Sequence, residues 1–85
     1  MGELSKLPNI GTEVERQLNA VGITTCDELK DAGCYHAWLC IQSIDPSACI
    51  HRLMALEGAI RGVKKSELPP EIKTELKTFY TAHKL

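Results

Sequence analysis

Apolar residues recur along this chain with the period of an α-helix. In the stretch after Gly11, the apolar side chains Val14, Leu18 and Val21 fall at i, i+4 and i+7, with charged and polar residues between them. Similar stripes return in later segments, at about residues 25–33, 34–43, 46–61 and 69–80. No segment alternates apolar and polar residues long enough to indicate a strand. The pattern predicts an all-α fold, a compact bundle of about five helices.

Capping residues set the boundaries of the expected helices. Gly22 ends the first helix in the manner of a left-handed C-terminal cap, and Thr25 and Glu28 have the spacing of a capping box for the second. We expect Asp45-Pro46 to open the long apolar helix at the centre of the bundle, because Asp accepts from free N–H groups and Pro at the first helical position loses no bond. We expect the second helix to stop at Gly33, a loop to begin at Gly62 and the last helix to start at Pro69-Pro70. A short extra turn is expected near Glu3 to Lys6.

The composition is that of an ordinary globular protein. The chain has 85 residues, of which 44% are hydrophobic and 25% charged, and we expect a single domain from residue 3 to residue 82. No apolar run approaches the roughly 18 residues that a membrane-spanning helix needs. No charged-then-apolar leader opens the sequence, so we expect a cytoplasmic protein without a membrane partner.

Residues 7–11, Leu-Pro-Asn-Ile-Gly, have the form of a tight turn that opens a helix. Together with Gly22 this pattern resembles the helix-hairpin-helix (SAM-like) motif, whose turn N–H groups often hold a nucleic-acid phosphate. In this chain Asn9, Gly11 and Thr12 are the candidate phosphate-binding residues, since helix N-termini favour anions. The carboxylates of Glu13 and Glu15 would oppose a phosphate there. The favoured interpretation is that Thr12 and Glu13 only stabilise the helix start.

Charge is divided unevenly between the two halves of the chain. Residues 1–45 carry three basic residues against seven acidic ones, whereas residues 46–85 carry seven basic against four acidic. The candidate DNA-binding or partner-binding cations of the second half are Arg61, Lys64 and Lys65 at a helix end, and Lys73, Lys77 and Lys84 on the last helix. Solvated surface is the alternative interpretation of these cations, and Arg61 is expected to pair with Glu57 at i,i+4.

The cysteines and histidines suggest metal-site fragments at first inspection. These fragments are Cys34-x-His36, with Cys40 nearby, and Cys49-x-His51. The four cysteines, with Cys26 as the fourth, do not have the paired spacing of a disulfide framework. Residues two apart on a helix point about 200° away from each other, so neither pair could chelate an ion or form a nucleophile–base dyad. We therefore predict no catalytic residue, no metal ligand and no cofactor, and we interpret the cysteines as reduced core thiols.

With this helix order, the chain resembles the C-terminal domain of the TfoX (Sxy) family of bacterial competence regulators. The resemblance extends from about Leu7 to Tyr80. It is carried by LPNIG (7–11), Leu18 with VGI (21–23), DEL (27–29) with Gly33, AWL (37–39), IDPSAC (44–49), LEGAIRG (56–62), LP (68–69) and FY (79–80). The resemblance implies a role in DNA transformation, in which the family's regulators promote transcription of DNA-uptake genes together with the cyclic-AMP receptor protein.

The function predicted from these observations is that of a non-catalytic regulatory or protein-interaction module. Its partner is expected to be another protein or a second copy of the chain. The alternative is a non-specific DNA-binding helix-hairpin-helix module in which the turn and the C-terminal lysines contact one duplex. A small enzyme is the third class, and only the presence of Cys and His favours it, so we expect no small-molecule substrate.

Overall fold

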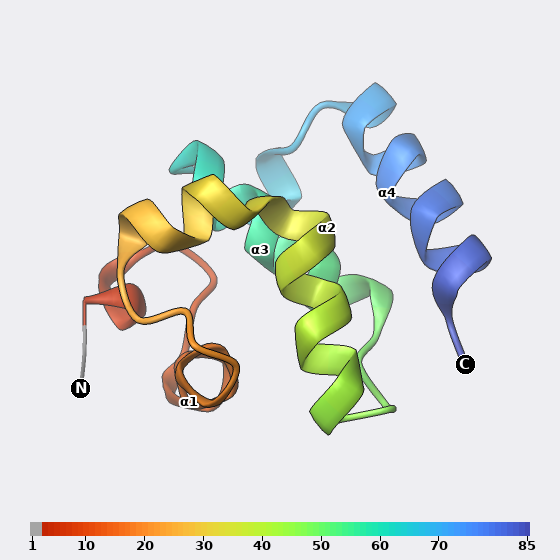
Figure 1. The fold of residues 1–85 in the computed structure, drawn as a ribbon. Helices are drawn as coiled ribbons and strands as arrows, with labels where there is room; N and C mark the ends of the chain where they lie inside the picture. Colours follow the sequence, from red (N-terminus) through yellow and green to blue (C-terminus); the bar gives the residue numbers. More distant parts are fainter. Residues whose placement is uncertain (1–2) are drawn as a thin grey trace.

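The computed structural model describes residues 3–85, in which all regular structure is helical, as the sequence predicts (Figure 1). The first described turn of the chain and the end of the last helix lie on opposite sides of the molecule. The elements are the 3₁₀-helices η1 (Leu4–Lys6) and η2 (Lys65–Glu67) and the α-helices α1 (Thr12–Ala20), α2 (Cys26–Ile44), α3 (Ile50–Arg61) and α4 (Pro70–His83). Within these residues no helix is both long and apolar enough to cross a membrane.

Helix α1 ends at a left-handed glycine, as predicted. Gly22 has φ of 90°, its N–H donates to the Asn19 carbonyl, and the Ile23 N–H donates to the Leu18 carbonyl at 2.8 Å. These two bonds form a Schellman cap, which satisfies carbonyls that the helix end would leave unpaired. Ile23 and Leu18 are both buried, so the cap also directs the chain into the core.

Helix α2 is two helical segments joined at a bend. Its capping box is the predicted one: Thr25 Oγ1 accepts from the Glu28 N–H, and Glu28 Oε1 accepts from the Thr25 N–H, both at 3.1 Å. Gly33 lies inside the run but has a non-helical backbone, with φ of 80° and ψ of 159°. Figure 1 shows the change of direction within α2. The expected break at Gly33 is therefore present, and four α-helices replace the expected five because the two segments run on without a loop.

The start of α3 differs from the prediction. The helix begins at Ile50, and Asp45 is the C-cap of α2 rather than the N-cap of α3. Asp45 Oδ1 instead accepts from the N–H of Ser47, two residues on, at 3.1 Å. This local bond stabilises a turn in competition with helix, so residues 46–49 connect the two helices and Cys49 is the N-cap.

Trp38 lies at the centre of the core and is fully buried. Its ring meets Phe79 and Tyr80 of α4 edge-on, with centroids 6.0 and 5.8 Å away, and its Nε1–H donates to the Cys49 carbonyl at 3.1 Å. Helix α3 is the central element, as expected, whereas only Leu76 of α4 is buried. Helix α4 thus covers one side of the bundle, starting at Pro70 as its first residue.

Candidate interaction surface

Asn9 fixes the hairpin turn, residues 7–11, to the segment that follows α3. This residue has the left-handed φ of 68° that such a turn requires, and Asn tolerates that conformation better than most residues do. Its Nδ2 donates to the Val63 carbonyl at 3.0 Å, and its Oδ1 accepts from the Lys65 N–H at 3.0 Å. The Asn9 side chain therefore holds the fold together, and phosphate binding by the backbone N–H groups of this turn stays a prediction.

Gly11 is the N-cap of α1, and its backbone is extended (φ −95°, ψ −175°). Glu13 is paired with Arg16 at 2.5 Å, and the hydrogen bond from Arg16 lowers the pKa of Glu13. Glu15 is buried and accepts the Ser5 N–H at 3.0 Å. The expectation that both carboxylates face a phosphate site is therefore wrong for Glu15, since it caps an N–H of the N-terminal turn inside the protein.

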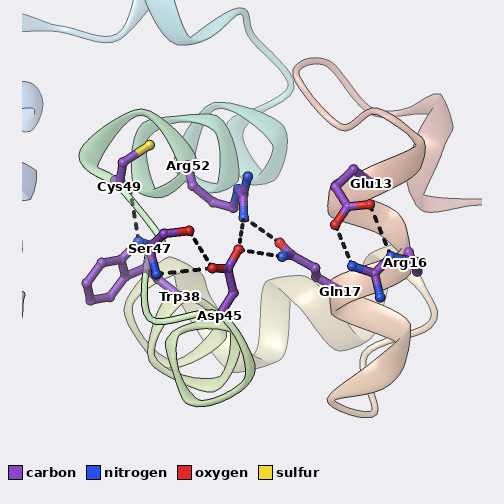
Figure 2. Close-up of polar contacts among 8 residues, drawn as sticks. All are labelled: Glu13, Arg16, Gln17, Trp38, Asp45, Ser47, Cys49 and Arg52. Carbon is purple, nitrogen blue, oxygen red and sulfur yellow. Dashed lines mark hydrogen bonds and ion pairs between the residues drawn. The ribbon is translucent and has the colours of Figure 1, made fainter. Parts of the chain in front are cut away.

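A polar clamp joins α1, the end of α2 and the start of α3 (Figure 2). Asp45 Oδ2 accepts from Gln17 Nε2 at 2.9 Å and from Arg52 Nη1 at 3.3 Å, and Arg52 also donates to Gln17 Oε1 at 2.6 Å. Ser47 donates to Asp45 Oδ1 through its hydroxyl and its N–H. These bonds from Ser47 and Gln17, with a further one from Arg52, lower the pKa of Asp45 to about 2. Arg52 is therefore engaged with a carboxylate, and it fixes the first turn of α3.

Arg61 is also engaged. It forms the predicted i,i+4 pair with Glu57, with Nε to Oε2 at 2.5 Å. Neither residue lines the hollows that contain Lys64 and Lys65. Arg61 therefore lies apart from these two lysines, with which it was predicted to form a cluster. Lys64 lies beside the hairpin turn, in a hollow of about 620 Å³ that also includes Asn9.

The predicted lysines do meet on the surface between α3 and α4. Lys65 comes from η2 and Lys73 and Lys77 from α4, and the three share a hollow of about 500 Å³ with apolar side chains of α3. Lys65 and His51 also line an adjoining hollow of about 200 Å³ that reaches Asn9. The hairpin turn and the C-terminal lysines thus belong to one face of the domain. Gly11 and Thr12 line none of these hollows.

Sequence reasoning missed His51 and Arg52 as members of this face. Both lie in the first turn of α3 and line the smaller hollow. The signal available was the absence of acidic residues from that turn, which is where helices usually carry them. Because the sequence predicted that this helix starts at Pro46, His51 and Arg52 were not recognised as part of its first turn.

The thiols are free, and their burial differs from the prediction. Only Cys34 is buried, whereas Cys26, Cys40 and Cys49 are half-buried. Burial, with the nearby Glu57 carboxylate, raises the pKa of the Cys34 thiol to about 12. Cys40 Sγ lies 3.6 Å from His36 Nε2, because the two are four residues apart on one face of α2. This pair differs from the i,i+2 pairs considered from the sequence, Cys34 with His36 and Cys49 with His51, which point apart on a helix. In residues 3–85 no three potential ligands gather around a metal position.

Residues 1–80 match the family model described as the TfoX C-terminal domain. The chain belongs to this family. A solved structure of an uncharacterized protein from Listeria monocytogenes, in a triclinic form, is 44% identical, with a TM-score of 0.93, over 95% of this chain and 92% of that one. A second, a protein of unknown function from the same organism in a tetragonal form, is 45% identical with a TM-score of 0.89, over 92% and 96%. No curated protein matches. The TfoX C-terminal assignment made from the motifs is confirmed, and these neighbours share its fold without assigning it a role.

Proposed function

We propose that this TfoX C-terminal domain is a non-catalytic regulatory module that binds a partner protein in the bacterial cytoplasm. The proposal places it in the control of DNA-transformation competence, the role that the resemblance to the TfoX regulators implies. One observation carries the interaction role. Lys65, Lys73 and Lys77 gather around a surface hollow, and among residues 3–85 none of them has an ion-pair partner. Unpaired cations at an apolar hollow favour association with an acidic surface.

The chemistry of the thiols supports a non-catalytic role. A thiol is nucleophilic as its thiolate, and a pKa of about 12 keeps Cys34 protonated at neutral pH. His36 and Cys40 form a pair on the outer surface of α2 and line none of the hollows described above. A covalent catalyst needs a cavity that holds its substrate against the nucleophile, and this pair lies away from the hollows at the α3–α4 face.

Gene deletion tests the regulatory role directly. In the source bacterium, deletion should lower the expression of DNA-uptake genes and the frequency of natural transformation, and the wild-type gene should restore both. Complementation with a folded variant of an unrelated bundle protein is the control for expression load. Unchanged transformation and unchanged uptake-gene expression after deletion would contradict the competence role.

DNA binding is the second candidate, and one observation favours it. The Lys65 N–H donates to Asn9 Oδ1 at 3.0 Å, so the hairpin turn and a C-terminal lysine are neighbours. Fluorescence anisotropy of labelled duplex DNA across a salt series tests this function, since phosphate contacts make affinity fall steeply with salt. Gly11→Leu is the informative variant, because no atom lies within 4 Å of a Cβ at that position. A hairpin-based DNA site requires that this variant lose binding while keeping its fold.

A further inference from the structure

Three lysines without an ion-pair partner among residues 3–85 gather over apolar side chains in the groove between α3 and α4. Three elements build this groove, which has a volume of about 500 Å³. Its lining residues are Ile50, His51 and Met54 of α3, Lys65 and Ser66 of η2, and Lys73 and Lys77 of α4. None of them carries a carboxylate. We use the name α3–α4 groove for this set.

The floor of the α3–α4 groove accepts an apolar side chain. Ile50 and Met54 are four residues apart, so they lie one above the other on the same face of α3. Both are half-buried and pack against the core while leaving part of their surface open. Methionine adapts its shape to different apolar partners. Ile50 and Met54 therefore offer an apolar contact, which a site that binds phosphate through charge alone would not need.

The rim of the groove fits carboxylates at a defined spacing. Lys73 and Lys77 are also four residues apart on one face of α4, about 6 Å along the helix axis. Lys73 Nζ is directed toward η2 by a hydrogen bond to the Ser66 carbonyl at 3.2 Å. By contrast, Arg16, Arg52 and Arg61 each have a carboxylate partner within the protein. Lys65, Lys73 and Lys77 have no such partner among residues 3–85, so their charge is available to a binding partner at this rim.

We infer that the α3–α4 groove binds an acidic amphipathic helix of a partner protein. An apolar side chain of that helix sits against Ile50 and Met54, and carboxylates at i and i+4 face Lys73 and Lys77. This inference rests on the proposed function and specifies its contact surface. Helices that dock in grooves are recognised in this way, by apolar anchors at helical spacing with charges beside them.

Two competing occupants fit the groove less well. Single-stranded nucleic acids bind through base stacking on rings such as Phe, Tyr and Trp as well as through phosphates, and the groove lining has none of these three, its one ring being the imidazole of His51. A second copy of the chain could offer Asp27 and Asp31, which have the i,i+4 spacing on α2. Leu29, the large apolar residue between them, is fully buried, so this segment has no large apolar anchor to place on the floor.

A binding assay with a synthetic probe tests the inference. The probe is a fluorescent helical peptide with Glu pairs at i and i+4 around a central Leu, and the control probe carries Gln in place of each Glu. We expect saturable anisotropy with the acidic probe and not with the neutral one. The double variant Lys73→Glu/Lys77→Glu should weaken binding at least about tenfold, a loss of about 1.4 kcal/mol. The control Lys6→Glu/Lys30→Glu has the same net charge, lies outside the groove and should stay within about twofold of wild type.

The floor is tested separately with Met54→Gln, which keeps the side-chain length and removes its apolar character. We expect a weakening of about threefold to tenfold with the acidic probe, provided that circular dichroism shows an unchanged helical fold. Equal binding by wild type and Lys73→Glu/Lys77→Glu would overturn the inference. Binding of duplex DNA that depends on the same lysines, with no binding of the acidic helix, would also overturn it. A dimer seen in sedimentation for wild type and lost in Lys73→Glu/Lys77→Glu would overturn it as well.

The complementation assay separates this inference from the proposed function. If deletion abolishes transformation but Lys73→Glu/Lys77→Glu restores it fully, the regulatory role holds and the groove is overturned. If deletion leaves transformation and uptake-gene expression unchanged while the acidic helix still binds at these lysines, the groove holds and the competence role fails.

Discussion

The side-chain amide of Asn9 occupies the space beside Gly58, where the hairpin turn meets the C-terminal end of α3. A Cβ built on Gly58 would lie 2.5 Å from Asn9 Nδ2 and 2.8 Å from the Val63 carbonyl oxygen. Real Cβ atoms do not approach other heavy atoms so closely. The glycine in the middle of α3 is therefore required by a residue 49 positions earlier in the chain, and not by the helix itself.

Gly58→Ala should destabilise the domain. In an exposed helix interior, alanine is more favourable than glycine by about 1 kcal/mol. Here the added methyl group must displace the Asn9 amide and shift the backbone at Val63, and overpacking of this kind costs about 1–3 kcal/mol. We expect a lower urea midpoint, with a net loss of up to about 2 kcal/mol in the free energy of unfolding.

Gly11→Ala is the matched control, since no atom lies within 4 Å of its added Cβ and its φ of −95° suits any residue. It should lower the free energy of unfolding by about 1 kcal/mol or less, since alanine is less favourable than glycine at a helix N-cap. A Gly58→Ala variant more stable than wild type, as expected for alanine in an open helix interior, would show that the close approach of Gly58 to Asn9 does not exist in solution.

Asn9→Ala should be among the more damaging substitutions in the turn. It removes the hydrogen bonds to the Val63 carbonyl and from the Lys65 N–H, worth about 1 kcal/mol each. It also places alanine at φ of 68°, which costs about 1 kcal/mol or more. The expected loss in thermal or urea unfolding is about 2–3 kcal/mol. Asn9→Gly keeps the left-handed turn at no strain, so it should lose about 1 kcal/mol less. Equal losses for the two variants would contradict the backbone argument.

The clamp at Asp45 should make stability depend on acid pH. Its pKa is about 2 in the folded protein against about 3.9 for an unperturbed Asp. Since the folded-state pKa is the lower one, the stabilising contribution is complete above about pH 4 and is lost as the pH falls toward about 2. Asp45→Asn should lower the melting temperature at neutral pH and flatten the decline of melting temperature between about pH 4 and about pH 2. The same slope in wild type and variant would assign the acid sensitivity to other carboxylates.

The four thiols should react at different rates. Cys34 is buried and its pKa is about 12, so it presents almost no thiolate and little accessible surface to an alkylating reagent. Peptide-level mass spectrometry after iodoacetamide treatment should find Cys34 modified more slowly than the half-buried Cys40. In urea the rates should converge. A native-state rate for Cys34 equal to that of Cys40 would contradict its burial.

The local features of this fold could be predicted from the sequence because they depend on residues a few positions apart. The stripe of Val14, Leu18 and Val21, the capping box of Thr25 and Glu28, and the left-handed Gly22 are all short-range patterns. The start of α3 was predicted wrongly because Asp45 has two local options, a helix N-cap or a turn closed by Ser47. The choice between them is made by Gln17 and Arg52, which also bind the Asp45 carboxylate in the folded protein.

By itself, the sequence determined the all-α class, most helix boundaries and membership of the TfoX C-terminal family. The tertiary structure decided how the side chains that could bind a partner are used. It engaged Asn9 with Val63 and Lys65, turned Glu15 inward, paired Arg61 with Glu57 and brought Lys65 beside Lys73 and Lys77. The physical reason is range: a helix is encoded by neighbours within one or two turns, whereas a surface forms only when distant helices pack and satisfy each other's polar groups.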